Sequence, residues 1–174
     1  DDLRFDAYES PEELSFAELL VVHEAEPNSE RQTQIAAIMA KRERQEQDEM
    51  AAVTRSTSEL RVIAAERPEH LTPTELRKVV FAEQDDAARE QFMAVLAHKE
   101  YIAKQEERKV SRPVAELRAV ALKQGGADKL TVAELRKVVS AEKDESRRQQ
   151  FTVALVQKEI EAEKDQELRD KFMV

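Results

Sequence analysis

The feature that most constrains the fold is an internal repeat. Residues 71–100 and 130–159 are identical at 17 of 30 aligned positions without a gap, and residues 14–43 match residues 71–100 at 10 of 30 positions. The copies begin 57 and 59 residues apart (71 − 14 and 130 − 71). Such repeats indicate modules that bury their apolar faces against one another. What recurs is a packing pattern, and no reactive group is carried along with it.

The composition is typical of long solvated helices. Only two glycines and five prolines occur, charged residues reach 37%, and aromatic residues make up 5%. No alternating apolar runs typical of strands are present. We therefore predict an all-α fold of tandem helical repeats, with three units of about 57–59 residues packed as a bundle or short α-solenoid. The expected divisions are an acidic leader over residues 1–13 and units over residues 14–70, 71–129 and 130–174, the last one truncated.

The sequence also indicates in which part of the cell the protein is expected. It contains no cysteine, which excludes disulfides and thiolate metal sites and favours a cytoplasmic or otherwise intracellular location. No apolar run approaches the roughly 20 residues that a membrane span needs, and no signal-peptide pattern opens the sequence. Because the sequence begins without Met and ends inside a helical pattern, we expect it to be part of a larger polypeptide.

The net charge of −9 comes entirely from the N-terminal part. Residues 1–30 hold ten acids and one base, whereas residues 31–174 hold 27 of each. An acidic leader disfavours contact with nucleic-acid phosphates and with anionic lipid, since both bind surplus Lys and Arg. The balanced remainder is typical of helices whose surfaces carry pairs of Glu with Lys or Arg.

Each copy opens with a helix start signal. Around residue 72, the Thr72 hydroxyl is suited to cap the first turn, Pro73 fits the first helical position, and Glu75 can reach back to the cap. The same cap-plus-Glu spacing recurs at Ser15 with Glu18, Ser56 with Glu59, and Thr131 with Glu134. The glutamate that all three copies share is therefore interpreted as structural.

Three helices are expected in a full unit. A short first helix ends at the AEPN, AEQD or AEKD segment, and a long second helix follows, for example over residues 86–108. One unbroken helix through both stretches is the alternative. A third, shorter helix is expected over residues 58–67 and again over 113–124. Pro68 ends the first of these, and Gly125 with Gly126 end the second.

Catalytic and metal-binding motifs are missing from the sequence. The histidines at positions 23, 70 and 98 do not recur between copies, and the pattern makes His23 a partly buried core residue. No HExxH, phosphate-binding glycine loop, serine nucleophile elbow or calcium loop is present. We therefore expect no enzyme activity, no cofactor, no metal and no small-molecule substrate.

One segment resembles a nucleic-acid-binding family. Residues 114–139 form a predicted helix, a short connection and a second helix, and this pair is loosely similar to the helix-extended-helix pattern of SAP-type DNA-binding modules. The resemblance implies that Arg136 and Lys137 could contact phosphates. The segment lacks the basic surplus that such modules need, so nucleic-acid binding is the third-ranked hypothesis.

The predicted outward face of the first helix differs between copies. Two basic positions in the second and third copies are apolar in the first, and Phe16 stands where the other copies have Pro73 and Val132. These apolar residues predict either packing by Leu3, Phe5 and Tyr8 of the leader or a partner site. The candidate partner-binding residues are Phe16, Leu20, Val21, Arg77, Lys78, Phe81, Arg136 and Lys137.

We therefore predict a non-enzymatic helical-repeat protein-protein interaction module or scaffold whose partner is another protein. A self-associating rod or coiled-coil segment is the alternative, and a SAP-like module is the second alternative.

Overall fold

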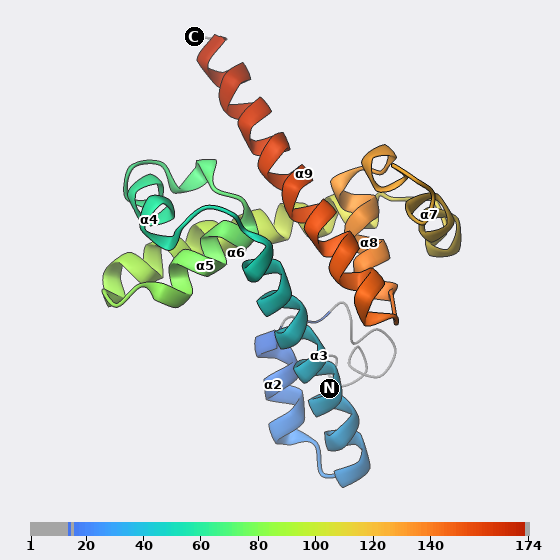
Figure 1. Ribbon diagram of the computed structural model, residues 1–174. Helices are drawn as coiled ribbons and strands as arrows, with labels where there is room; N and C mark the ends of the chain where they lie inside the picture. The colour runs from blue at the N-terminus through green and yellow to red at the C-terminus, as the bar shows by residue number, and fades with distance from the viewer. Residues whose placement is uncertain (1–13, 15, 173–174) are drawn as a thin grey trace. The chain divides into compact units, whose positions relative to one another are not determined.

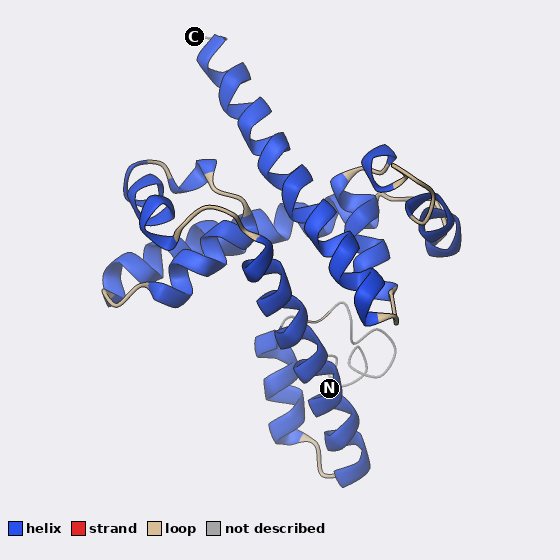
Figure 2. Cartoon of the chain, in the orientation of Figure 1, coloured by secondary structure: helices blue, strands red, loops and turns tan. Residues whose placement is uncertain are grey.

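The computed structural model describes the backbone at residues 14 and 16–172 and the side chains at residues 14 and 18–172. Within these residues the chain forms eight α-helices, two short 3-10 helices and no strand (Figures 1 and 2). The predicted all-α class is confirmed. The chain divides into two compact units, residues 1–47 and 48–174. The predicted leader, residues 1–13, lies outside the described residues.

The first unit holds α2 (Phe16–Ala25) and most of α3 (Ser29–Ala52), whose end from Asp48 onward belongs to the second unit. The predicted break at Pro27 is present. The Asn28 side chain accepts a hydrogen bond from the backbone N–H of Arg31 at 3.0 Å, and the Glu26 carboxylate accepts one from the N–H of Asn28 at 3.0 Å. The buried apolar residues of this unit are Leu14, Leu19, Val22 and Ile35.

The second unit continues with two sets of helices. The first set is α4 (Thr57–Glu66), the 3-10 helix η2 (Pro68–His70), α5 (Pro73–Ala82) and α6 (Asp86–Arg108). The second set is α7 (Val114–Ala121), the 3-10 helix η3 (Ala127–Lys129), α8 (Val132–Ala141) and α9 (Glu145–Phe172). Within the sets α5 packs on α4 and α6, and α8 packs on α7 and α9; α6 also packs on α8 (Figure 1).

The break between the short and the long helix is real in this unit as well. Asp85 caps α6 by accepting the N–H of Ala88 at 2.7 Å, and the Glu83 carboxylate accepts the N–H groups of Gln84 and Asp85. These side chains satisfy amides that an uninterrupted helix would bond internally. The alternative of one unbroken helix is therefore wrong for α5 and α6.

The capping signals predict the helix starts correctly. Complete capping boxes begin α4 at Ser56 and Glu59, α5 at Thr72 and Glu75, and α8 at Thr131 and Glu134. Ser15, the fourth predicted cap, lies outside the described residues. Behind the boxes, Leu19, Leu76 and Leu135 are each 0% exposed. The shared leucine of the three sequence copies is thus a core residue in every copy.

The helix expected over 113–124 ends earlier, at Ala121, and Gly125 and Gly126 lie in the turn between α7 and η3, where they play different parts. Gly125 adopts a φ of +64° with open space around it, whereas a Cβ on Gly126 would lie 1.8 Å from the carbonyl oxygen of Val120. We expect Gly125→Ala to destabilise the second unit by about 1 kcal/mol through its left-handed backbone. Gly126→Ala should cost about 2 kcal/mol, because the backbone itself must shift. Urea unfolding measures the loss in free energy of unfolding for each variant. An equal loss, or a larger loss for Gly125→Ala than for Gly126→Ala, contradicts the prediction.

Candidate partner-binding surface

The arginines of the predicted basic pairs are held inside the fold. Arg77 donates from Nη1 to Glu49 at 2.9 Å and from Nε to Glu100 at 3.0 Å. Arg136 donates from Nε to Glu159 at 3.0 Å. Only 21% of the Arg77 side chain and 18% of the Arg136 side chain are exposed. The expectation that these arginines point outward is wrong, because glutamates of neighbouring helices pair with them.

The lysines of the same pairs bind backbone carbonyls. Lys78 donates from Nζ to the carbonyl oxygens of Val53 at 3.3 Å and Arg55 at 3.2 Å. Lys137 donates to the carbonyl oxygen of Val110 at 3.1 Å. The acceptors lie just after the C-terminal ends of α3 and α6, where carbonyls lack helical partners and cations are favoured. Each lysine therefore attaches a short helix to the end of the preceding long helix. The prediction that these lysine side chains point outward is also wrong.

A signal for the arginine partners was present in the sequence. Arg77 and Glu100 are 23 residues apart, and so are Arg136 and Glu159. The two pairs recur together at matching positions of the copies. The first copy keeps the glutamate as Glu43 but has Leu20 in place of the arginine. Joint recurrence of opposite charges at one fixed spacing indicates an ion pair between the two positions.

Glu159 is the most deeply buried member of these pairs. Its side chain is 6% exposed, and it accepts a hydrogen bond from the Thr74 hydroxyl at 3.2 Å in addition to the bonds from Arg136. Burial raises the pKa of Glu159, while the nearby Arg136 charge opposes this effect. The Arg136 side chain thus compensates a carboxylate that has little access to water.

Two further carboxylates lie at the C-terminal ends of the short helices α5 and α8. Glu83 pairs with Arg61 at 3.0 Å and Glu142 with Arg118 at 2.7 Å, and each carboxylate also accepts the next two backbone N–H groups. The hydrogen bond from Arg118 lowers the pKa of Glu142 to about 2, with help from the Asp144 N–H. For Glu83, the N–H of Asp85 is the main cause of a lowered pKa. Both groups are ionised and structural at neutral pH.

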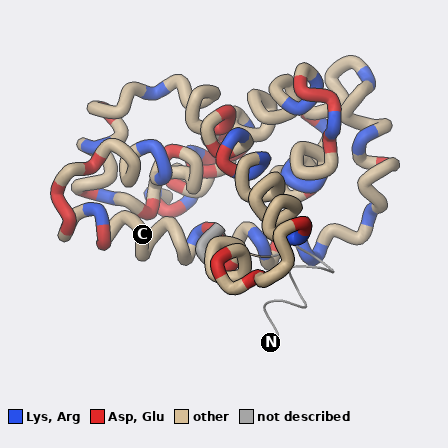
Figure 3. The backbone as a smooth tube through the Cα atoms, turned by 90° about the horizontal axis from the view of Figure 1, so that it is seen from below, with Lys and Arg blue, Asp and Glu red and all other residues tan. Residues whose placement is uncertain are grey.

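Basic and acidic residues are interspersed along the helices of the second unit (Figure 3). Many are partners in bonds of this kind, which leaves the apolar candidates as the exposed part of the predicted set. Phe81 is 86% exposed, Val21 57% and Leu20 41%. Phe16 begins α2, but its side chain lies outside the described residues. The predicted set is therefore divided between internal contacts and exposed apolar residues on α2 and α5.

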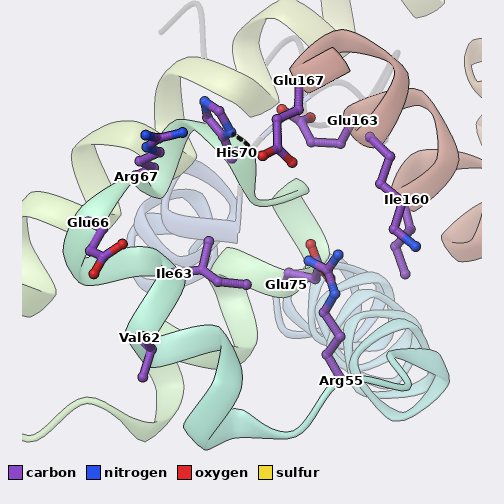
Figure 4. Close-up of a pocket in the computed structure, with 11 residues that line it drawn as sticks. Arg55, Val62, Ile63, Glu66, Arg67, His70, Glu75, Ile160, Glu163 and Glu167 are labelled. Carbon is purple, nitrogen blue, oxygen red and sulfur yellow. Dashed lines mark ion pairs between the residues drawn. The ribbon is translucent and has the colours of Figure 1, made fainter. Parts of the chain in front are cut away.

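The second unit also contains a pocket between α4, η2 and α9 (Figure 4), with a volume of about 230 Å³. Charges of both signs gather there. Glu75 is 1% exposed, and its Oε1 atom lies 3.4 Å from Arg55 without a hydrogen bond. His70 lies 3.8 Å from Glu167, whose pKa is lowered mainly by a hydrogen bond from Lys171. The lining residues are Arg55, Val62, Ile63, Glu66, Arg67, His70, Glu75, Ile160, Glu163, Lys164 and Glu167.

Among the described residues, no three His, Cys, Asp or Glu side chains gather as a metal site. None of the helices in residues 16–172 is both long and apolar enough to cross a membrane. His23 is partly buried, as the pattern predicts, and His98 is exposed.

Comparison with protein-family models, with curated proteins and with solved structures gave no match to this chain.

Proposed function

We propose that this chain is a non-enzymatic, repeat-built interaction module or scaffold that displays a side-chain surface to another protein. The observation that carries the proposal is Phe81, which is 86% exposed on α5 while Arg77 and Lys78 of the same helix are committed to internal partners. Exposed aromatic side chains are enriched at the centres of protein interfaces. The capped and mutually packed helices supply the rigid support that such a residue needs.

The recurring contacts support a modular construction. Capping boxes, lysine-to-carbonyl bonds and arginine pairs with glutamates 23 residues away occur at matching places around α5 and α8. In our proposal these contacts are the invariant part of each module. The variable part is what remains exposed, and the position of Phe81 is occupied by Ser140 in α8. Variation at such positions would select the partner.

The test replaces Phe81 with serine, which gives α5 the residue that α8 has at this position. We expect affinity for a protein captured on the immobilised chain to fall at least about tenfold, as for an aromatic interface residue. The free energy of unfolding should change by less than about 0.5 kcal/mol, because the side chain is exposed. Binding isotherms with the captured protein and urea unfolding measure the two quantities.

Ser140→Ala is the matched control and should leave binding unchanged. A variant carrying both Leu20→Arg and Val21→Lys, which restores the basic pair of the other copies, reports on α2 separately. If Phe81→Ser and this double variant both capture the same proteins with unchanged affinity, the proposed surface is wrong.

The nucleic-acid alternative is weakened by the contacts of its two candidate residues. Arg136 is paired with Glu159, and Lys137 is bonded to the carbonyl of Val110. Neither group is free for a phosphate without breaking a contact within the fold. A mobility shift with duplex DNA at physiological salt would revive this alternative.

A further inference from the structure

Two glutamates that occupy the same place in their capping boxes have different surroundings. In α8, the Oε1 atom of Glu134 accepts a hydrogen bond from Arg112 at 3.1 Å. In α5, the Oε2 atom of Glu75 accepts the N–H of Thr72 at 3.0 Å, but its Oε1 atom is buried without a hydrogen bond. The Glu75 carboxylate therefore has one unfilled acceptor position, although its side chain is only 1% exposed.

The cation beside Glu75 does not fill this position. Arg55 directly precedes the cap residue of α4, just as Arg112 directly precedes the cap residue of α7, so the two arginines correspond. Arg112 forms a hydrogen bond with its glutamate, whereas the Nη1 atom of Arg55 lies 3.4 Å from Oε1 of Glu75 and forms none (Figure 4). A buried acceptor and a group of N–H donors thus lie side by side without satisfying each other.

Arg55 and Glu75 both line the pocket between α4, η2 and α9. Its volume of about 230 Å³ is far more than the roughly 10–15 Å³ that one water molecule needs, so a single buried water would leave most of it empty. The volume is also below the about 300–1,000 Å³ that is typical of sites for drug-sized ligands. Apolar side chains, among them Ile63 of α4 and Ile160 of α9, complete the wall. The pocket therefore suits a small molecule with an aliphatic part.

The paired groups determine what the polar part of such a molecule must offer. Glu75 needs a donor, and Arg55 needs an acceptor. A cation would be repelled by Arg55, and an anion would be repelled by Glu75. An amide carries an N–H donor and a carbonyl acceptor without a net charge, so one amide group satisfies both side chains.

We propose that this pocket binds a small amide that carries an aliphatic group. The amide N–H donates to Oε1 of Glu75, and the amide carbonyl accepts from Arg55. The aliphatic group packs against Ile63 and Ile160. The site goes beyond the proposed function, because Phe81 does not line the pocket.

The test titrates isovaleramide, an amide with a branched aliphatic group, into the full 174-residue chain, isotopically labelled for NMR. We expect saturable shifts of the signals of pocket residues, with a Kd on the order of 1 mM for so small a ligand. Methyl isovalerate has the same aliphatic group and a carbonyl but no N–H donor, so it should bind at least about tenfold more weakly. This comparison needs no variant.

A peptide is the other source of amide groups. N-acetylvaline methylamide offers an amide and a branched aliphatic group within a peptide-like chain. It should bind more weakly than isovaleramide, because the pocket is too small for the flanking atoms. Tighter binding of this compound would overturn a small molecule as the ligand.

Glu75→Gln changes the unfilled acceptor into a donor. The Gln oxygen can still accept the N–H of Thr72, as in other capping boxes, so its NH2 group takes the place of Oε1. The affinity for isovaleramide should fall at least about tenfold, because two donors then face each other. Glu134→Gln makes the same change in the capping box of α8. It is the matched control and should bind isovaleramide like the wild type.

Urea unfolding shows whether each variant is folded under the conditions of the titration. The proposal is overturned by a wild type without saturable shifts, by an ester that binds as tightly as the amide, or by equal affinities of the two folded Gln variants. Phe81→Ser should bind isovaleramide like the wild type. Unchanged capture of proteins by that variant would therefore reject the proposed function and leave the amide site intact.

Discussion

Replacing Arg136 with alanine is expected to lower the free energy of unfolding of the second unit by about 3 kcal/mol, because Glu159 would stay buried without its cation. The Glu159 side chain is 6% exposed, and Thr74 supplies a single neutral hydrogen bond at 3.2 Å. Urea unfolding followed by circular dichroism measures the loss.

Arg77→Ala is the matched control, and its expected loss is smaller, about 2 kcal/mol, because one of its two partners, Glu100, is exposed to water while Glu49 is buried. The side chains of Glu49 and Glu100 are 11% and 44% exposed. Adding Glu159→Gln to Arg136→Ala should recover part of the loss, since the neutral amide removes the uncompensated charge. Equal losses for the two arginine variants would contradict this account of the Arg136 pair.

Local features of the fold could be predicted because residues within a few positions of one another determine them. The boxes at Thr72 and Thr131 and the burial of Leu19, Leu76 and Leu135 follow from spacing inside one or two helical turns. The contacts of Arg77 and Lys78 could not be found in this way. Helical periodicity shows which side chains share a face, but it does not show which distant helix covers that face.

One tetrapeptide shows how tertiary context decides a local conformation. The sequence AEKD at residues 141–144 ends α8 and precedes α9, whereas the same four residues at 162–165 lie inside α9. In the first case the Glu142 carboxylate accepts a hydrogen bond from Arg118. It also accepts the backbone N–H groups of Lys143 and Asp144 in the turn between α8 and α9. In the second case Glu163 pairs with Lys99 of α6 at 3.0 Å. Sequence alone does not distinguish the two positions, because Arg118 and Lys99 reach them only in the folded chain.

Glu142 should make the second unit sensitive to acid. Its pKa in the folded chain is about 2, against an ordinary value of 4.5, so the folded state binds fewer protons than the unfolded state between these values. The stabilisation is therefore complete above pH 4.5 and is lost as the pH falls toward 2. At neutral pH, Glu142→Gln should lower the free energy of unfolding by about 2 kcal/mol, the contribution of hydrogen bonds to a charged group.

Urea unfolding at a series of pH values tests this expectation. The wild type and Glu142→Gln should differ most at neutral pH and converge as the pH approaches the folded pKa of about 2. Glu161→Gln, at an exposed position of α9, is the control and should follow the wild type throughout. Arg118→Met should behave like Glu142→Gln, since the Arg118 hydrogen bond is the main cause of the lowered pKa of Glu142. A constant difference at every pH would show that Glu142 stabilises the α8–α9 turn through its shape and not through its charge.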